Sequence, residues 1–180
     1  MKNALNILVT SVGRRSYIIE YFKRALKGSG EVHAANSVMT YAMQVADHAF
    51  VTPLIYDQKY IDTVLDYCRA RRISAVLSLL DIDLPVLAGS FNRFAEIGVT
   101  LVVPDLEVTR ICNDKWRTFE FLYRHNISVP LSFLTLADCR QALASGEIHF
   151  PLVVKPRWGL GSTGLFYAEN DAELNVFHDK

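Results

Sequence analysis

Residues 4–103 alternate between short apolar runs and amphipathic segments, and this alternation constrains the fold more than any other feature. The amphipathic segments place apolar residues at helical spacing; they cover residues 14–27, 41–47, 59–71 and 84–97. The apolar runs are rich in β-branched and aliphatic residues, which favours buried strands; they cover residues 4–10, 31–35, 48–51, 74–80 and 99–103. Strand–helix–strand repeats form right-handed parallel crossovers. The pattern therefore predicts an α/β fold with an open parallel sheet.

Polar residues follow two of the expected strands, at the edge where ligands of parallel sheets bind. The turn after the first strand carries two arginines, which suit a phosphate or a carboxylate, and two aspartates after residues 74–80 suit an amine. Two alternatives stay open, because the arginines can be a solvated helix start and the aspartates can cap the next helix. The candidate substrate residues are Ser11, Gly13, Arg14, Arg15, Asp81 and Asp83.

From residue 105 onward, helices follow one another with little strand between them. The expected elements are a helix over 105–111, a helix from the N-cap Asn113 to about residue 125, a strand over 128–134 and a helix over 135–145. Lys115 falls in the first turn of the second helix, where the helix dipole disfavours a cation. Free N–H groups in that turn favour an anion. This local conflict indicates a functional lysine.

A glycine-rich loop follows the short apolar run of residues 152–154. Lys155 and Pro156 end that strand, and Ser162 and Thr163 lie among three glycines at 159, 161 and 164. Bare amides and small hydroxyls suit a polyphosphate, because bulkier side chains would hold its oxygens too far away. The alternative is an ordinary surface hairpin. A returning strand over 165–168 would make the loop a flap over a phosphate.

Two commoner phosphate-binding motifs do not fit this loop. The P-loop pattern fails because Leu165, and not lysine, follows Gly164. The spacing of Gly159, Gly161 and Gly164 matches the dinucleotide fingerprint, but that motif opens a helix and a strand is expected here.

The sequence V-V-K-P followed by R-W-G-L-G-S-T-G resembles the first subdomain of the ATP-grasp family, in which a strand lysine and a flexible glycine loop hold ATP. Lys115, in N-D-K-W, resembles the family's other nucleotide-contacting lysine. The arrangement is most similar to the carbamoyl-phosphate synthase large subunit and biotin carboxylase. The nucleotide-binding residues that the resemblance implies are Lys115, Lys155, Arg157, Gly159, Gly161, Ser162, Thr163 and Gly164.

The resemblance implies a Rossmann-like pre-ATP-grasp domain over residues 1–110 and an incomplete first α+β part of the ATP-grasp domain over 111–180. It further implies an ATP-dependent carboxylate–amine ligase that acts through an acyl phosphate, with ATP and Mg²⁺ as cofactors, small carboxylate and amine substrates, and a homodimer. The magnesium ligands are expected outside this sequence. No catalytic residue is therefore assigned, and the chain alone is expected to be inactive.

Two other functions remain open at this stage. A nucleotide-binding module without catalysis would keep the lysines and the loop. A protein that binds NAD(P) or a nucleotide sugar would use the N-terminal sheet instead. Against the second, the turn at Ser11 contains one glycine, and Asn36 stands where a ribose-binding acid is wanted.

Composition excludes several classes of partner. The 19 lysines and arginines balance 19 acids, so charge gives no reason to expect binding to nucleic acid or to an anionic membrane. No apolar run approaches the roughly 20 residues that span a bilayer, and the N-terminus shows no cleavable leader pattern. Three scattered cysteines indicate reduced thiols and a cytoplasmic protein. The five histidines are also scattered, so no zinc site is expected.

Overall fold

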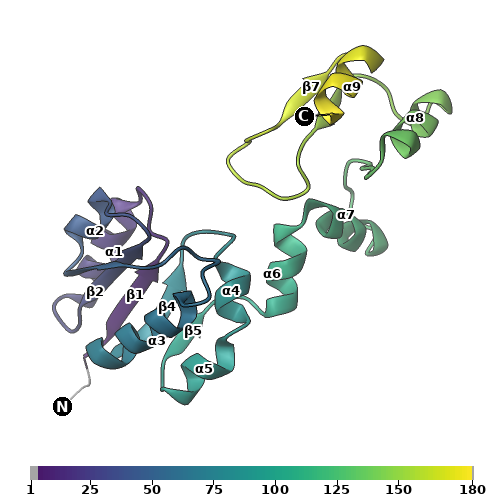
Figure 1. The fold of residues 1–180 in the computed structure, drawn as a ribbon. Coiled ribbons are helices and arrows are strands. Elements are labelled where there is room, and N and C mark those ends of the chain that lie inside the picture. Colours follow the sequence, from purple (N-terminus) through teal and green to yellow (C-terminus); the bar gives the residue numbers. More distant parts are fainter. Residues whose placement is uncertain (1–3, 180) are drawn as a thin grey trace. The chain divides into compact units, whose positions relative to one another are not determined.

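The computed structural model describes residues 4–179, which form two compact units divided between Thr109 and Arg110 (Figure 1). In the part described, no helix is both long enough and apolar enough to span a bilayer.

The first unit is built on a five-stranded sheet in which every neighbouring pair is parallel. Its strands are β1 (Asn6–Thr10), β2 (Val32–Asn36), β3 (His48–Val51), β4 (Ile73–Ser78) and β5 (Thr100–Val102). Their spatial order is β3-β2-β1-β4-β5, so the chain order reverses between β1 and β4. This arrangement confirms the predicted parallel α/β fold, and its reversal point is where such sheets bind ligands.

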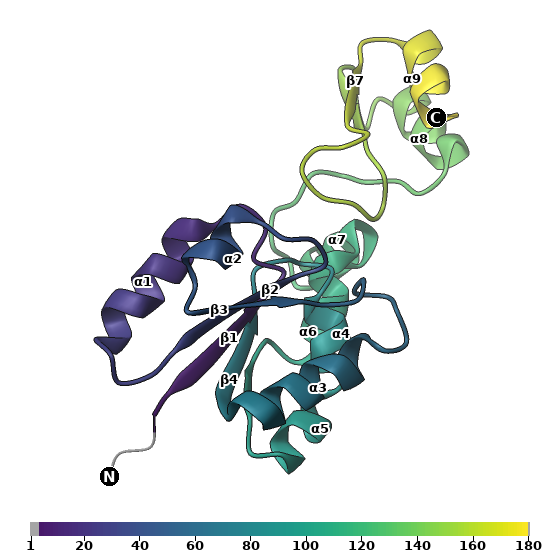
Figure 2. The same cartoon turned by 60° about the vertical axis from the view of Figure 1, so that its left-hand side comes forward.

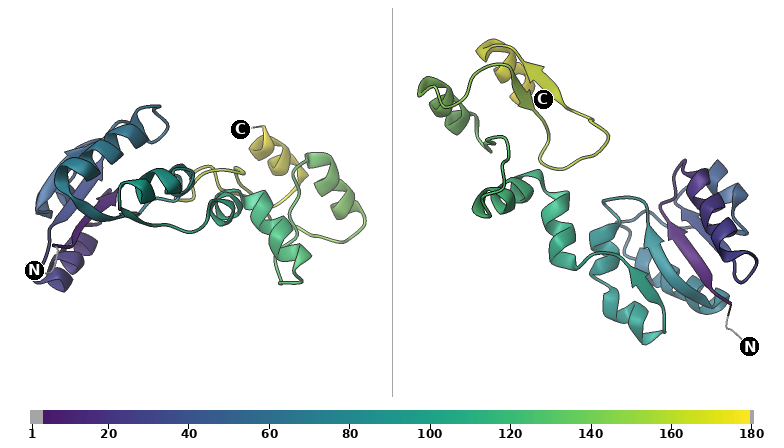
Figure 3. Two further views of the ribbon diagram at one scale, coloured as in Figure 1. Left: turned by 90° about the horizontal axis from the view of Figure 1, so that it is seen from below. Right: turned by 180° about the vertical axis from the view of Figure 1, so that it is seen from behind.

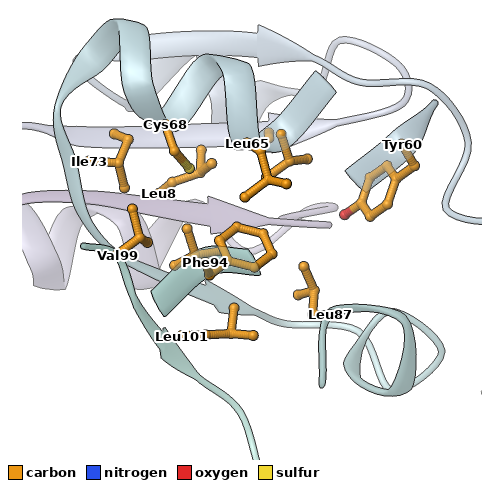
Figure 4. Close-up of a cluster of buried hydrophobic side chains, with 12 residues drawn as sticks. Leu8, Tyr60, Leu65, Cys68, Ile73, Leu87, Phe94, Val99 and Leu101 are labelled. Atoms are coloured by element: carbon orange, nitrogen blue, oxygen red, sulfur yellow. The ribbon is translucent and has the colours of Figure 1, made fainter. Parts of the chain in front are cut away.

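Helices cover both faces of this sheet, as Figure 2 shows. They are α1 (Ser16–Leu26), α2 (Tyr41–Val45), α3 (Tyr60–Arg71), α4 (Leu84–Ala88) and α5 (Phe91–Glu96). Successive residues of a strand point to opposite faces. Ile7 and Val9 therefore pack in the core with α1 and α2, whereas Leu8 packs in the core with α3, α4 and α5 (Figure 4).

The predicted helix over residues 84–97 is wrong as a single element, because the chain forms α4 and α5 with Gly89 and Ser90 between them. Glycine is about 1 kcal/mol less favourable than alanine inside a helix, and Ser90 leaves the helical conformation at φ −111° and ψ 13°. Leu87 and Phe94, one from each helix, are both fully buried in the same core.

The second unit contains a two-stranded antiparallel hairpin and several helices, seen from two further sides in Figure 3. The elements are α6 (Leu106–Asn113), which spans the division between the units, α7 (Lys115–Arg124), α8 (Leu136–Ala144), β6 (Leu152–Val154), β7 (Phe166–Ala168) and α9 (Asp171–His178). Helix α9 packs on the hairpin, where the rings of Phe166 and Phe177 stack with centroids 4.8 Å apart. Arg140 of α8 forms an ion pair with Asp171 at the start of α9.

Two predictions for this unit are wrong. Residues 128–134 form no strand, and among the described residues the sheet of this unit contains only β6 and β7. Pro130 lies in this segment and has no N–H to donate to a neighbouring strand. Asn113 is the last residue of α6, and Asp114 is the N-cap of α7. Aspartate and asparagine are equally good caps, so sequence alone did not decide between these neighbours.

Candidate functional site

The glycine-rich loop connects β6 to β7, which confirms the predicted returning strand. Val154 pairs with Phe166, so residues 155–165 form the connection. Four of these residues have left-handed backbone conformations: Gly159, Gly161, Ser162 and Gly164 have φ of 138°, 65°, 59° and 73°. At Gly164 an added Cβ would lie 2.9 Å from Cγ of Pro156. Glycine is therefore required at 164 both by conformation and by space.

An ion pair joins the beginning of this loop to the start of α7. Nε of Arg157 donates to Oδ1 of Asp114 at 2.8 Å, and its Nη2 donates to Oδ2 at 2.6 Å. Oδ1 of Asp114 also accepts the backbone N–H groups of Trp116 and Arg117, which caps the helix. The hydrogen bonds from Arg157 hold the pKa of Asp114 below its ordinary value, against the effect of burial. Bidentate pairing of this kind fixes geometry as well as adding energy.

Lys115 extends the same connection. Its backbone N–H donates to the carbonyl of Arg157 at 3.2 Å, and its Nζ donates to the carbonyl of Gly159 at 3.0 Å. Two features predicted separately from the sequence, the helix-start lysine and the glycine loop, thus meet in space. The result is a cation beside a loop of small residues.

The remaining predicted nucleotide-binding residues with polar side chains differ in their exposure and their contacts. Lys155 directly follows β6 and is exposed; among the described residues it has no recorded ion pair or hydrogen bond. Ser162 and Thr163 are also exposed at the tip of the loop. Arg157 differs from them, because its guanidinium is held by Asp114 and lies 4.6 Å from the ring centroid of Trp158. An exposed cation without a partner is suited to an anionic ligand.

In the first unit, the reversal point of the sheet holds a buried carboxylate surrounded by hydroxyl groups, the Asp83 cluster (Thr10, Ser11, Tyr60, Ser78 and Asp83). Oδ2 of Asp83 accepts from the hydroxyls of Thr10, Ser11 and Ser78 at 2.7, 2.9 and 2.7 Å. Oδ1 accepts from the Tyr60 hydroxyl at 2.9 Å. Burial raises the pKa of Tyr60, and the negative charge of Asp83 adds to the effect.

The structure places the predicted substrate residues in several different environments. Ser11 and Asp83 are buried and bonded to each other, and the side chain of Asp83 does not cap α4, so the capping alternative is wrong for Asp83. Arg14 and Asp81 are exposed. The backbone N–H of Gly13 donates to Oδ1 of Asn36 at 3.4 Å. Arg15 is partly exposed at the start of α1.

The sequence alone does not point to four residues that build the glycine-loop connection and the Asp83 cluster. Asp114 was overlooked beside Asn113, although an acid next to a helix-start lysine is itself a cap signal. In the sequence, Thr10, Tyr60 and Ser78 are ordinary strand and helix residues, and only their position around Asp83 gives them a role.

Two protein-family models match this chain. Residues 7–102 match the PylC-like N-terminal domain family, and residues 112–180 match the ATP-grasp domain family. The arginine-specific large chain of carbamoyl phosphate synthase from Halalkalibacterium halodurans is 24% identical over 136 residues, which cover 74% of this chain and 12% of that one.

Two solved structures are similar in fold. The biotin carboxylase domain of the Hydrogenobacter thermophilus 2-oxoglutarate carboxylase, solved as a dimer with MgADP, ADP and bicarbonate, has a TM-score of 0.68 and 20% identity, covering 97% of this chain and 39% of that one. The N5-carboxyaminoimidazole synthetase from Staphylococcus aureus has a TM-score of 0.68 and 15% identity, covering 99% and 44%. The chain thus spans less than half the length of each of these relatives.

Proposed function

Because the chain belongs to the family with a PylC-like N-terminal domain followed by an ATP-grasp domain, we propose that it supplies part of the nucleotide site of an ATP-dependent carboxylate–amine ligase. In this proposal residues 1–110 form the domain that precedes the nucleotide module, and residues 111–180 form the first part of that module. The reaction transfers the terminal phosphoryl group of ATP to a carboxylate, giving ADP and an acyl phosphate. A nitrogen nucleophile then attacks the acyl carbon and releases phosphate.

One observation carries the proposal: Nζ of Lys115 lies 3.0 Å from the carbonyl of Gly159, inside a loop with left-handed glycines. Transfer to a carboxylate brings two anions together, and that repulsion must be neutralised. Two unit charges about 4 Å apart interact by on the order of 4 kcal/mol at an effective dielectric of about 20. Lys115 and Lys155 supply positive charge for the phosphates. The loop closes over them and excludes water, which protects the acyl phosphate from hydrolysis.

Arg157 takes a positioning role in this proposal, because Asp114 already holds its guanidinium. The pair keeps the first residues of the loop at the start of α7, so Lys115 and the loop amides face one ligand. Gly161, Ser162, Thr163 and Gly164 form the part that contacts phosphate oxygens. At the sheet edge of the first unit, the exposed Arg14 and Asp81 are the residues we assign to a small carboxylate or amine substrate.

The described side chains suit binding of ATP better than direct coordination of Mg²⁺. Within the described residues, the group of His, Cys, Asp and Glu side chains close enough to share an ion is Glu31, His33 and His48 of the first unit. Mg²⁺ prefers oxygen ligands and near-octahedral geometry, and two of these three ligands are imidazoles. We therefore assign no magnesium ligand among the residues described. We also propose a homodimer, which sedimentation of the chain at several concentrations tests.

The nucleotide site is tested by titrating the chain with Mg-ATP while following tryptophan fluorescence. Both tryptophans report on the site, since Trp116 lies in the first turn of α7 and Trp158 lies in the loop. Lys115→Met and Lys155→Met should each weaken binding at least tenfold, because about a third of the charge interaction of about 4 kcal/mol, roughly 1.4 kcal/mol, already corresponds to tenfold in affinity. Lys59→Met is the matched control, because Lys59 is an exposed lysine of the first unit. Equal affinity in all three variants, or saturable binding of NAD⁺ in place of Mg-ATP, would contradict the proposal.

A further inference from the structure

A second group of polar side chains lies at the opposite edge of the first unit's sheet from the Asp83 cluster. Glu31 immediately precedes β2, His33 is the second residue of β2, and His48 is the first residue of β3. The two strands are parallel neighbours, and their register places His33 directly opposite His48. Glu31 and His33 are two residues apart and so point to the same face. The three side chains therefore gather at the amino ends of the strands.

The distances within this group match those between ligands of one metal ion. Oε2 of Glu31 lies 3.4 Å from Nε2 of His33 and 3.3 Å from Nε2 of His48, and the three ligand atoms lie within 4.8 Å of one another. Zinc binds nitrogen and oxygen at about 2.0–2.1 Å, so the edges of its coordination tetrahedron are about 3.3–3.4 Å long. Two of the three edges already have that length.

His33 presents a buried nitrogen that needs a partner. Its side chain is fully buried, and among the residues described no properly oriented hydrogen bond reaches its Nε2. Its other nitrogen, Nδ1, lies 2.9 Å from the hydroxyl of Tyr67 on α3. When Nδ1 donates to Tyr67, the lone pair of Nε2 points toward Glu31 and His48. Histidine ligands of metals are held in this way by a second partner, which fixes the tautomer.

The surroundings favour the neutral imidazole, which is the form that binds metals. Burial lowers the pKa of His33 below its ordinary value, and His48 acts in the same direction while Glu31 opposes it. The rings of His33 and His48 stack with their centroids 4.6 Å apart. The positive charge of Arg71 also lowers the pKa of His33, because it repels the protonated imidazole. The same charge would repel a bound metal ion.

We propose that Glu31, His33 and His48 bind a divalent transition-metal ion, with Zn²⁺ as the best match. Imidazole nitrogens with one carboxylate suit zinc, whereas magnesium and calcium select oxygen ligands. Three protein ligands leave a fourth position, which solvent reaches past the exposed Glu31 and the partly exposed His48. The ion joins β2 to the edge strand β3. This site is independent of the proposed ligase function, because it contains none of the residues assigned to ATP.

The site is tested by measuring Zn²⁺ affinity of the full chain in competition with a chromophoric chelator. A Cys112→Ser background removes an exposed thiol that would compete for the metal. We expect one ion per chain, and a Co²⁺ complex with the strong visible absorption of low coordination number. Glu31→Gln removes an exposed ligand and His48→Gln a partly exposed one, so both variants should still fold, as far-UV circular dichroism would verify. Each should weaken Zn²⁺ binding by at least about 10- to 100-fold, the loss expected for a partner that only orients a ligand.

Tyr67→Phe keeps the ring that stacks on Phe50 and removes only the hydroxyl bonded to His33. Loss of such an outer partner weakens metal binding about 10- to 100-fold. Arg71→Gln should tighten binding by removing a nearby positive charge. His178→Gln is the matched control, because His178 lies beside Asp179 in the second unit and offers an unrelated imidazole–carboxylate pair. Absence of Zn²⁺ binding, or an affinity in Glu31→Gln and His48→Gln equal to that of the control, would overturn the site.

Discussion

Tyr60→Phe isolates the contribution of the Asp83 cluster to the stability of the first unit. The substitution keeps a ring that is 1% exposed and removes one hydroxyl, the donor to Oδ1 of Asp83 at 2.9 Å. The three other donors recorded for this carboxylate all bond to Oδ2. A buried carboxylate oxygen thus loses its donor, and the close-packed core leaves no room for a replacing water.

The size of the effect follows from the charge on the acceptor. A hydrogen bond to a charged group contributes about 1.5–3 kcal/mol, roughly twice the value for a neutral pair. The unfolding free energy should fall by that amount, since no cavity forms and the ring contacts persist. With an m-value of about 1.5 kcal/mol/M, the urea midpoint should fall by about 1–2 M.

The assay must read the first unit, and tryptophan fluorescence does not, because both tryptophans lie in the second unit. Urea unfolding is therefore followed by hydrogen exchange of peptides that contain β1 and β4. Tyr17→Phe is the control, since Tyr17 is 50% exposed and its change should stay within about 0.5 kcal/mol. If Tyr60→Phe and Tyr17→Phe unfold at the same urea concentration, the Asp83 cluster does not stabilise the unit.

Three further predictions concern the second unit and use tryptophan fluorescence. Asp114→Ala should destabilise more than Asp114→Asn by about 1 kcal/mol, because asparagine keeps the helix cap and alanine does not; equal midpoints would contradict the cap. The native pKa of Asp114 is lowered, so its stabilisation is present above the unfolded pKa of about 3.9 and is lost as pH falls through the native pKa. Asp114→Asn should flatten that acid limb of a pH titration, and an unchanged limb would assign it to other acids. Gly161→Ala and Gly164→Ala both place alanine at positive φ, which costs about 1–2 kcal/mol. Only Gly164→Ala also meets Pro156 at 2.9 Å, so it should unfold at lower urea than Gly161→Ala, and the reverse order would refute the loop geometry.

Several features of this protein follow from the sequence alone because they depend on local chemistry. The alternation of apolar runs and helical stripes specifies a parallel sheet, since each element must bury one face against the next. The strand after Gly164 is also predicted from its local sequence. Because the dinucleotide fingerprint opens a helix, this strand excludes that motif as the role of the three glycines. The prediction that Lys115 is functional likewise rests on a local conflict, between its charge and the helix dipole.

Other features depend on contacts between distant residues, and only the tertiary structure decides them. Asn113 and Asp114 are equal as caps in sequence, and Arg157, 43 residues away, bonds to the second of them. The histidines look scattered along the chain, yet His33 and His48 stand opposite each other in the sheet. The register of two parallel strands is fixed by the whole core on which they pack. The 14 residues between the two histidines do not by themselves reveal that register.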